Sequence, residues 1–201
     1  MKDTTPEMIQ SEYVNKFYVC GNIVNKYSSP NALILIVGTT NPTTQRRDYP
    51  RMIITDSELM KQANAELEIG DRVSVSGDIR SSKKYPSGVV VITQYTKELS
   101  RLEAAFSGIE VKPDANIVLL RGKISREHYS PSPDVTITTL EMYDEEGYIN
   151  YPRFTCFGNK AKRIRDKGVG EFVDALCYIK SRNRKEGVKV SRQSIVLQHM
   201  K

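Results

Sequence analysis

The chain is poor in the residues that most often build metal and catalytic centres. Its 201 residues include no tryptophan, two histidines and three cysteines. Cys20, Cys156 and Cys177 are odd in number and far apart, which favours neither a disulfide framework nor a zinc knuckle, so we interpret them as small core residues. No carboxylate cluster or metal-ligand spacing accompanies His128 or His199 in the sequence. We therefore expect no metal, no cofactor and no enzymatic activity.

Long apolar runs are also lacking. No segment approaches the roughly 20 apolar residues needed to span a bilayer, and the first residues do not carry the apolar stretch of a signal peptide. We expect a cytoplasmic protein without membrane association. The glycines form no phosphate-binding motif, and we interpret the acidic run at residues 144–146, which ends at Gly147, as a solvated hairpin tip.

The net charge is +6 and is unevenly distributed along the chain. Residues 1–100 hold 12 Lys and Arg against 11 Asp and Glu, whereas residues 101–201 hold 18 against 13. A basic balance favours polyanionic partners such as nucleic acid. The second half carries nearly all of the excess.

The two halves of the sequence repeat each other. The tripeptide Tyr-Pro-Arg at residues 49–51 returns at residues 151–153, 102 positions later. Further anchors return in the same order at offsets of 100 to 102: Asn15, Gly21 and Ile23 as Asn116, Gly122 and Ile124, residues 69–73 as 169–173, and residues 79–81 as 179–181. Anchors that recur in this way predict two copies of one domain.

Each copy has the pattern of a small β-barrel. In the first copy, apolar alternation and turn signals predict five strands, with one helix between the third and fourth. The strands are expected at residues 14–24, 32–37, 51–55, 72–80 and 89–93, the helix at residues 57–67 with Ser57 as its N-cap, and an exposed loop at residues 39–48. A five-stranded barrel with a helix in this place is the OB fold.

The second copy follows the same plan, with strands expected at residues 116–124, 135–142, 153–157, 172–180 and 188–197 and a short helix at residues 159–165. Between the copies, the helical spacing of Leu99, Leu102, Ala105 and Phe106 predicts a short packed helix. We therefore expect an all-β protein with short helices, made of two tandem OB-fold five-stranded barrels. The expected domains are residues 1–96, a helical connector at residues 97–114, and residues 115–201.

The strands carry recurring motifs. The first strand of each copy places Asn before an apolar run that ends in Gly, at residues 15–21 and 116–122. At residues 151–161, an aromatic residue, an arginine, an apolar run, Phe157 and Gly158 precede Lys160 and Ala161. In these motifs, and over nearly all of both copies, the chain resembles the bacterial single-stranded DNA-binding proteins.

The resemblance implies that Tyr49 and Tyr151 occupy the base-stacking aromatic position of that family and that Phe157 is a second stacking ring. A ring on an open sheet binds any base, at roughly 1 to 3 kcal/mol per base. Tyr85 stands beside two lysines in a predicted hairpin loop, which suits a stacking finger. The residues expected to contact phosphates are Arg51, Arg153, Lys83, Lys84, Arg182, Arg184 and Lys185.

The chain departs from the family at three places. It has no tryptophan, the first copy has Thr55 where the family has Phe, and residues 197–201 do not form the acidic, Phe-terminated tip of the family. These departures indicate a specialised relative, of the kind that phages or mobile elements encode. Because the second copy keeps Phe157 and the positive charge, we expect residues 115–200 to bind more tightly than residues 12–96.

We therefore expect a single-stranded DNA-binding protein without strong sequence preference that acts in DNA replication, recombination or repair. The alternative is an OB-fold adaptor of a replication or conjugation assembly that binds DNA weakly. RNA is left open as a ligand because stacking and phosphate contacts do not read the sugar. The resemblance also implies a homodimer with four OB folds, in which the first strands, residues 15–23 and 116–124, are the pairing surface that would otherwise be an exposed edge.

Overall fold

The computed structural model describes residues 13–41, 44–83, 90–102, 113–144, 147–181 and 193–201, and for residues 82, 83 and 90–92 the description is limited to the backbone. The first copy folds into β1 (Val14–Ser29), β2 (Ala32–Thr40), β3 (Arg47–Asp48), β4 (Arg51–Ile54), α2 (Ser57–Glu66), β5 (Arg72–Lys83) and β6 (Val90–Arg101). The second copy folds into β7 (Ala115–Pro131), β8 (Asp134–Tyr143), β9 (Ile149–Asn150), β10 (Arg153–Phe157), α3 (Asn159–Lys167), β11 (Phe172–Ser181) and β12 (Gln193–Met200). Both copies thus contain the same elements in the same order.

Each copy closes into a five-stranded barrel. In the first, β1 pairs with β2 and β5, β2 with β4, and β5 with β6, all antiparallel. The barrel closes where β4 and β6 run parallel, at Met52–Gln94. In the second, β7, β8, β10, β12 and β11 close by the same pairings, with the parallel contact at Thr155–Val196. This is the OB topology, so the predicted all-β fold of two tandem barrels with short helices is confirmed.

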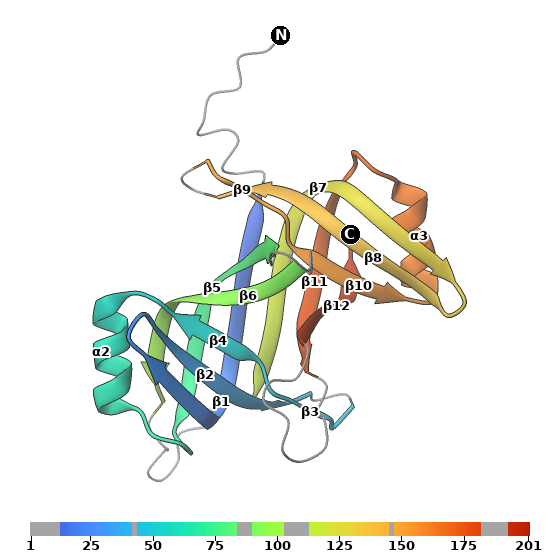
Figure 1. The fold of residues 1–201 in the computed structure, drawn as a ribbon. Coiled ribbons are helices and arrows are strands. Elements are labelled where there is room, and N and C mark those ends of the chain that lie inside the picture. The colour runs from blue at the N-terminus through green and yellow to red at the C-terminus, as the bar shows by residue number, and fades with distance from the viewer. Residues whose placement is uncertain (1–12, 42–43, 84–89, 103–112, 145–146, 182–192) are drawn as a thin grey trace.

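Strands β1 and β7 join the two barrels into one continuous sheet (Figure 1). They are antiparallel, and the ladder is centred on the pair Phe17–Val118. These residues occupy equivalent positions of the repeat, 101 residues apart, so a pseudo-twofold axis passes through the pair. The first strands, which the resemblance implied as the pairing surface of a homodimer, thus pair with each other within one chain.

The segment predicted as an exposed loop at residues 39–48 is partly strand and partly buried. Thr39 and Thr40 end β2 and pair with β3, and the exposed fractions of Thr39 and Asp48 are only 1% and 8%. The polar composition of the segment suggested exposure. Its polar groups are buried because the second barrel supplies partners, as where the Ser181 N–H donates to Asp48 Oδ1 at 3.1 Å.

The predicted helical connector is wrong at its start. Residues 97–101 continue β6, which pairs with β5 as far as Val73–Arg101, so the strand extends past the expected boundary at residue 96. The neighbouring strand β5 overrides the helical spacing because it pairs with β6 along its whole length. Residues 103–112 lie outside the described part of the chain. Beyond them, Asp114 accepts hydrogen bonds from the Thr40 N–H and from Arg72, each at 2.8 Å.

The two helices lie on opposite sides of the molecule, each against its own barrel (Figure 1). The N-cap of α2 is Asp56 and not the predicted Ser57, because Asp56 Oδ1 accepts from the Leu59 N–H at 2.8 Å. At the other end of α2, the Nζ of Lys26 on β1 donates to the carbonyl oxygens of Ala63 and Leu67, at 2.9 and 2.8 Å. A strand residue thus satisfies the unpaired carbonyls at the end of the helix.

Inward-facing residues of both barrels form the core. The three cysteines are buried with free thiols, which confirms their interpretation as core residues, and burial raises the pKa of Cys156 to about 11. Gly21 allows a close approach of two strands, because a Cβ at this position would lie 2.2 Å from the carbonyl oxygen of Gly38.

Candidate nucleic-acid interface

The outer face of β8 and β10 presents an exposed ring in the second barrel. Side chains alternate along β10, so that Arg153 and Phe157 face away from the core. Phe157 lies opposite Val135 of β8 and is 47% exposed. Ile137, the next outward residue of β8, is 40% exposed. An open ring with aliphatic neighbours on a sheet is an arrangement on which unpaired bases can stack.

The first barrel carries its exposed ring on a different strand. Thr55 stands at the position equivalent to Phe157, but Tyr27 of β1 is 48% exposed on the same outer face. Tyr27 lies opposite Ile34 of β2, and Ile34 lies opposite Ile53 of β4. Asn25 donates through Nδ2 to the Tyr27 hydroxyl at 2.7 Å. The ring lost at position 55 thus has a counterpart on β1.

Sequence reasoning missed Tyr27 because the predicted first strand ends at residue 24. In the structure β1 continues to Ser29 after a bulge between Ile23 and Asn25, which shifts the alternation of its side chains. Tyr27 could have been found from its residue type, because aromatic residues are enriched in strands and would have extended the predicted strand past residue 24.

The two predicted phosphate-binding arginines on these faces have different surroundings. Arg153 donates through Nε to Thr139 Oγ1 at 3.2 Å. Arg51 lies opposite Ile36, whose side chain offers no acceptor, and the buried Nε of Arg51 has no hydrogen-bond partner among the described residues. Burial lowers the pKa of the Arg51 guanidinium. Thr139 therefore orients the arginine of the second barrel, and the first barrel has no equivalent hydroxyl.

The two predicted stacking tyrosines lie at the turns after β3 and β9, and we call these turns the Tyr49 corner (residues 48–49) and the Tyr151 corner (residues 150–151). Tyr151 is 42% exposed, close in sequence to Tyr148 at 69%. Tyr49 is half-buried, and its N–H donates to Ser181 Oγ at 2.6 Å. The Tyr151 corner is therefore the more open, and Tyr148 adds an exposed ring that the repeat pattern did not reveal.

The remaining predicted residues fall in the connections between β5 and β6 and between β11 and β12. The backbone of Lys83 ends β5, but its side chain is not described, and Lys84, Tyr85, Arg182, Arg184 and Lys185 lie outside the described residues. The strand ends that lead into these connections are described. Ser81 donates its N–H to Asn150 Oδ1, and Ser181 donates its N–H to Asp48 Oδ1, each at 3.1 Å. Ser81 near the end of β5 and Ser181 at the end of β11 thus each contact the corner of the other barrel.

The two corners differ in charge. Burial raises the pKa of Asp48, while the hydrogen bond from the Ser181 N–H and the charge of Lys180 lower it in part. Burial also raises the pKa of Tyr178, and the charge of Asp48 adds to this effect. The position equivalent to Asp48 in the second copy is the neutral Asn150. The Tyr49 corner therefore holds a carboxylate where the Tyr151 corner holds an amide.

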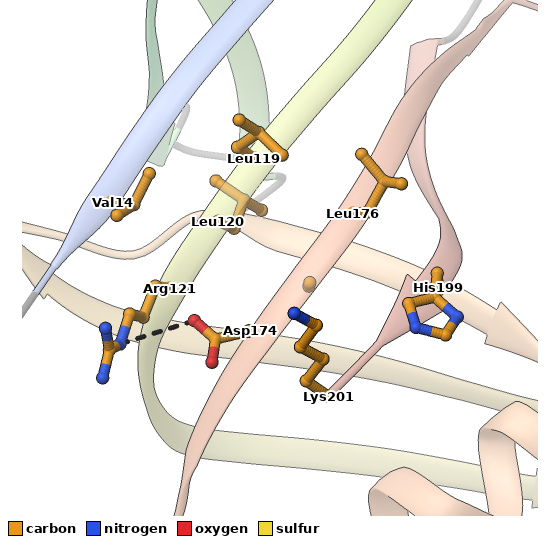
Figure 2. Close-up of a pocket in the computed structure, with 9 residues that line it drawn as sticks. Val14, Leu119, Leu120, Arg121, Asp174, Leu176, His199 and Lys201 are labelled. Carbon is orange, nitrogen blue, oxygen red and sulfur yellow. Dashed lines mark ion pairs between the residues drawn. The ribbon is translucent and has the colours of Figure 1, made fainter.

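A pocket of about 430 Å³ lies on the outer sheet face between β7 and β11 (Figure 2). Leu119 and Leu176 line it, and Arg121 and Asp174 form an ion pair across the two strands at 3.4 Å. The described residues contain no cluster of three or more side chains that could hold a metal ion. None of the helices in the described ranges is long and apolar enough to cross a membrane.

Comparisons with known proteins identify the fold. No family model matches the chain, and no curated protein matches its sequence. The solved structure of the wild-type single-stranded DNA binding protein from Thermus aquaticus matches with a TM-score of 0.67 and 14% identity, over 94% of this chain and 93% of that chain. A deletion mutant of the same protein matches with a TM-score of 0.66 and 14% identity, over 96% and 95%. The chain thus has the tandem OB fold, and the likeness extends across both barrels.

Proposed function

We propose that this protein binds single-stranded DNA without strong sequence preference and that it acts in DNA replication, recombination or repair. The observation that carries the proposal is the exposed ring on the same outer face of both barrels, Tyr27 in the first and Phe157 in the second. Stacking tolerates any base because every base has a π-face. The Thermus aquaticus protein of the same fold is named for binding single-stranded DNA, which supports this function.

Charge supports the same proposal. The net charge of +6 favours a polyanion, and the outward arginine of the second barrel, Arg153, is oriented by Thr139 on the same strand as Phe157, four residues before it. A stacking ring and a cation on one sheet face bind an unpaired strand through both its bases and its phosphates. The proposed activity is binding, with no bond made or broken.

A titration with three fluorescent ligands tests the proposal. We expect oligo-dT to bind clearly more tightly than duplex DNA of equal length, because the bases of a duplex are stacked and cannot reach the rings. Oligo-rU in the same assay measures whether the sugar is read. Failure to bind oligo-dT at low salt would contradict the proposal and favour the adaptor function instead.

We further propose that two chains form a homodimer, which brings the number of barrels to four. Because β1 and β7 already pair within the chain, their edges are not available to a second copy. Their outer face carries Ile117 and Leu119, which are 39% and 44% exposed and lie next to the pseudo-twofold axis. The pocket in Figure 2 continues this apolar surface to Leu176. A second copy that packs on this face would cover the apolar side chains.

A further inference from the structure

Both backbone polar groups of Tyr49 in the first barrel are hydrogen-bonded to side chains of the second barrel. Its N–H donates to Ser181 Oγ at 2.6 Å, and its carbonyl oxygen accepts from Gln193 Nε2 at 3.0 Å. Ser181 and Gln193 face each other as the last described pair of the β11–β12 ladder. The backbone of Tyr49 is therefore fixed at the point where the connection between β11 and β12 begins and ends.

The neighbouring groups come from both barrels as well. A cleft of about 220 Å³ is lined by Thr39 and Asp48 of the first barrel and by Asn116, Tyr178 and Gln198 of the second. Asp48 is buried there, and its Oδ1 accepts from the Ser181 N–H. This buried hydrogen bond fixes the position of one barrel relative to the other. If the barrels shifted, the Asp48 carboxylate and the Ser181 N–H would be left buried without partners.

The side chain of Tyr49 is near a cation. The Tyr49 Cε1 atom and the Arg47 Nη2 atom lie 3.7 and 3.8 Å from the place that a Cβ on Gly38 would take, so the two atoms are within 7.5 Å of each other. Arg47 is exposed and stands two residues before Tyr49. A ring and a guanidinium at this spacing match the two parts of a nucleotide, since the ring stacks on a base and the guanidinium binds a phosphate.

The Tyr151 corner is built differently. There the contact to the first barrel is made by the side chain of Asn150, which accepts from the Ser81 N–H and donates to the carbonyl oxygen of Ile79. In the Tyr49 corner the backbone of the tyrosine itself is held. This difference provides a matched control, because Ser81 and Ser181 are equivalent in the repeat, but Ser181 is hydrogen-bonded to Tyr49 itself whereas Ser81 is hydrogen-bonded to Asn150.

We propose that Tyr49 is part of the nucleic-acid site of the second barrel, and that Ser181 and Gln193 are positioning residues that fix its ring for a nucleotide crossing between the barrels. The ligand is one unpaired nucleotide, with its base on Tyr49 and its phosphate on Arg47. This inference rests on the proposed function. Its consequence is that the first barrel supplies the ring and the second barrel sets the place of that ring.

A double-mutant cycle in the full chain tests the inference, with oligo-dT affinity as the readout. Ser181→Ala removes the acceptor of the Tyr49 N–H, and we expect it to weaken binding about threefold to tenfold, the effect of one net hydrogen bond. In a Tyr49→Ala background the same substitution should have no further effect. Gln193→Leu serves as a second variant with the same expectation. The control, Ser81→Ala, should have the same effect in both backgrounds.

The outcomes separate this inference from the function on which it rests. Coupling of Ser181 and Gln193 to Tyr49, without coupling of Ser81, supports it. Clear binding of oligo-dT with additive effects of Tyr49→Ala and Ser181→Ala, or with no effect of Ser181→Ala, overturns the shared site and leaves the proposed function intact. Absence of oligo-dT binding by the unchanged protein overturns both.

Discussion

At the scale of single residues, Phe157 is the proposed stacking ring of the second barrel. Phe157→Ala should weaken oligo-dT binding about 5-fold to 100-fold, because the ring contributes roughly 1 to 3 kcal/mol per base. Tyr49→Ala should cost less, because Tyr49 is half-buried while Phe157 is 47% exposed. Fluorescence anisotropy measures both affinities.

The control for this comparison is Val169→Ala, which removes an exposed apolar side chain after α3, away from the proposed stacking rings in the sequence. We expect its oligo-dT affinity to equal that of the unchanged protein. A larger loss from Tyr49→Ala than from Phe157→Ala would show that the main stacking platform is not on β10.

Asp48 predicts a pH-dependent contribution to stability. Burial raises its pKa in the folded state, so the folded protein binds this proton more tightly than the unfolded chain does. The resulting stability is fully present below the unfolded pKa and is lost as the pH rises through the folded pKa. Asp48→Asn keeps an acceptor for the Ser181 N–H without a charge, and it should raise the free energy of unfolding at pH 7 by roughly 0.5 to 1 kcal/mol.

Urea unfolding at two pH values checks this sign. The gain from Asp48→Asn should be full at pH 7 and close to zero near pH 3, where the carboxyl is protonated in both states. Glu58→Gln, at an exposed position of α2, serves as the control and should change little at either pH. A gain that grows toward low pH would mean that the hydrogen bond and Lys180 outweigh burial at Asp48.

At the scale of secondary-structure elements, Lys26 ties β1 to the end of α2. Its ammonium group donates to the carbonyl oxygens of Ala63, Asn64 and Leu67. Lys26→Met should therefore lower the free energy of unfolding by about 1 to 2 kcal/mol, measured by urea unfolding. Lys61→Met on the exposed side of the same helix is the control, because its ion pair with Glu58 is solvated and should contribute little. Equal effects of the two substitutions would argue against the cap.

Most strands and both helices could be predicted because their signals are local. Apolar alternation and turn residues placed β2, β4, β5, β8, β10, β11 and the helices within a few residues of their observed bounds. The sequence-based predictions fail where contacts with a strand distant in the sequence determine the local structure. Residues 97–101 are strand because β5 pairs with them, as in Val75–Leu99. Asp48 is buried because its carboxylate accepts a hydrogen bond from Ser181, a residue 133 positions away in the sequence.

The candidate site was predictable to the extent that the repeat and the family motif mark it. The motif located Phe157 and Tyr151, and both are exposed. It could not locate Tyr27, whose exposure depends on the bulge in β1. The contact of Tyr49 with Ser181 joins the two copies and has no signature within either copy.

At the scale of the whole molecule, the β1–β7 ladder makes one sheet from two barrels and leaves its outer face open. If two chains pack on this face, light scattering at micromolar concentration should give about twice the chain mass of 22.8 kDa. Leu119→Lys should reduce the mass to that of one chain, because it places a charge on the apolar face. Ile137→Lys, on the β8 face, should leave the mass unchanged. A mass near 22.8 kDa for the unchanged protein would contradict the dimer and leave the two barrels as a bivalent monomer.

The salt dependence of oligo-dT affinity tests most directly whether this molecule is a single-strand binder. If several phosphates are neutralised, the logarithm of the affinity should fall linearly with the logarithm of salt concentration, by about 0.7 for each phosphate contacted. Duplex DNA of equal length should bind more weakly at every salt concentration. Absence of oligo-dT binding at low salt, or equal affinity for the duplex throughout the series, would contradict single-strand binding by the exposed rings of the two barrels.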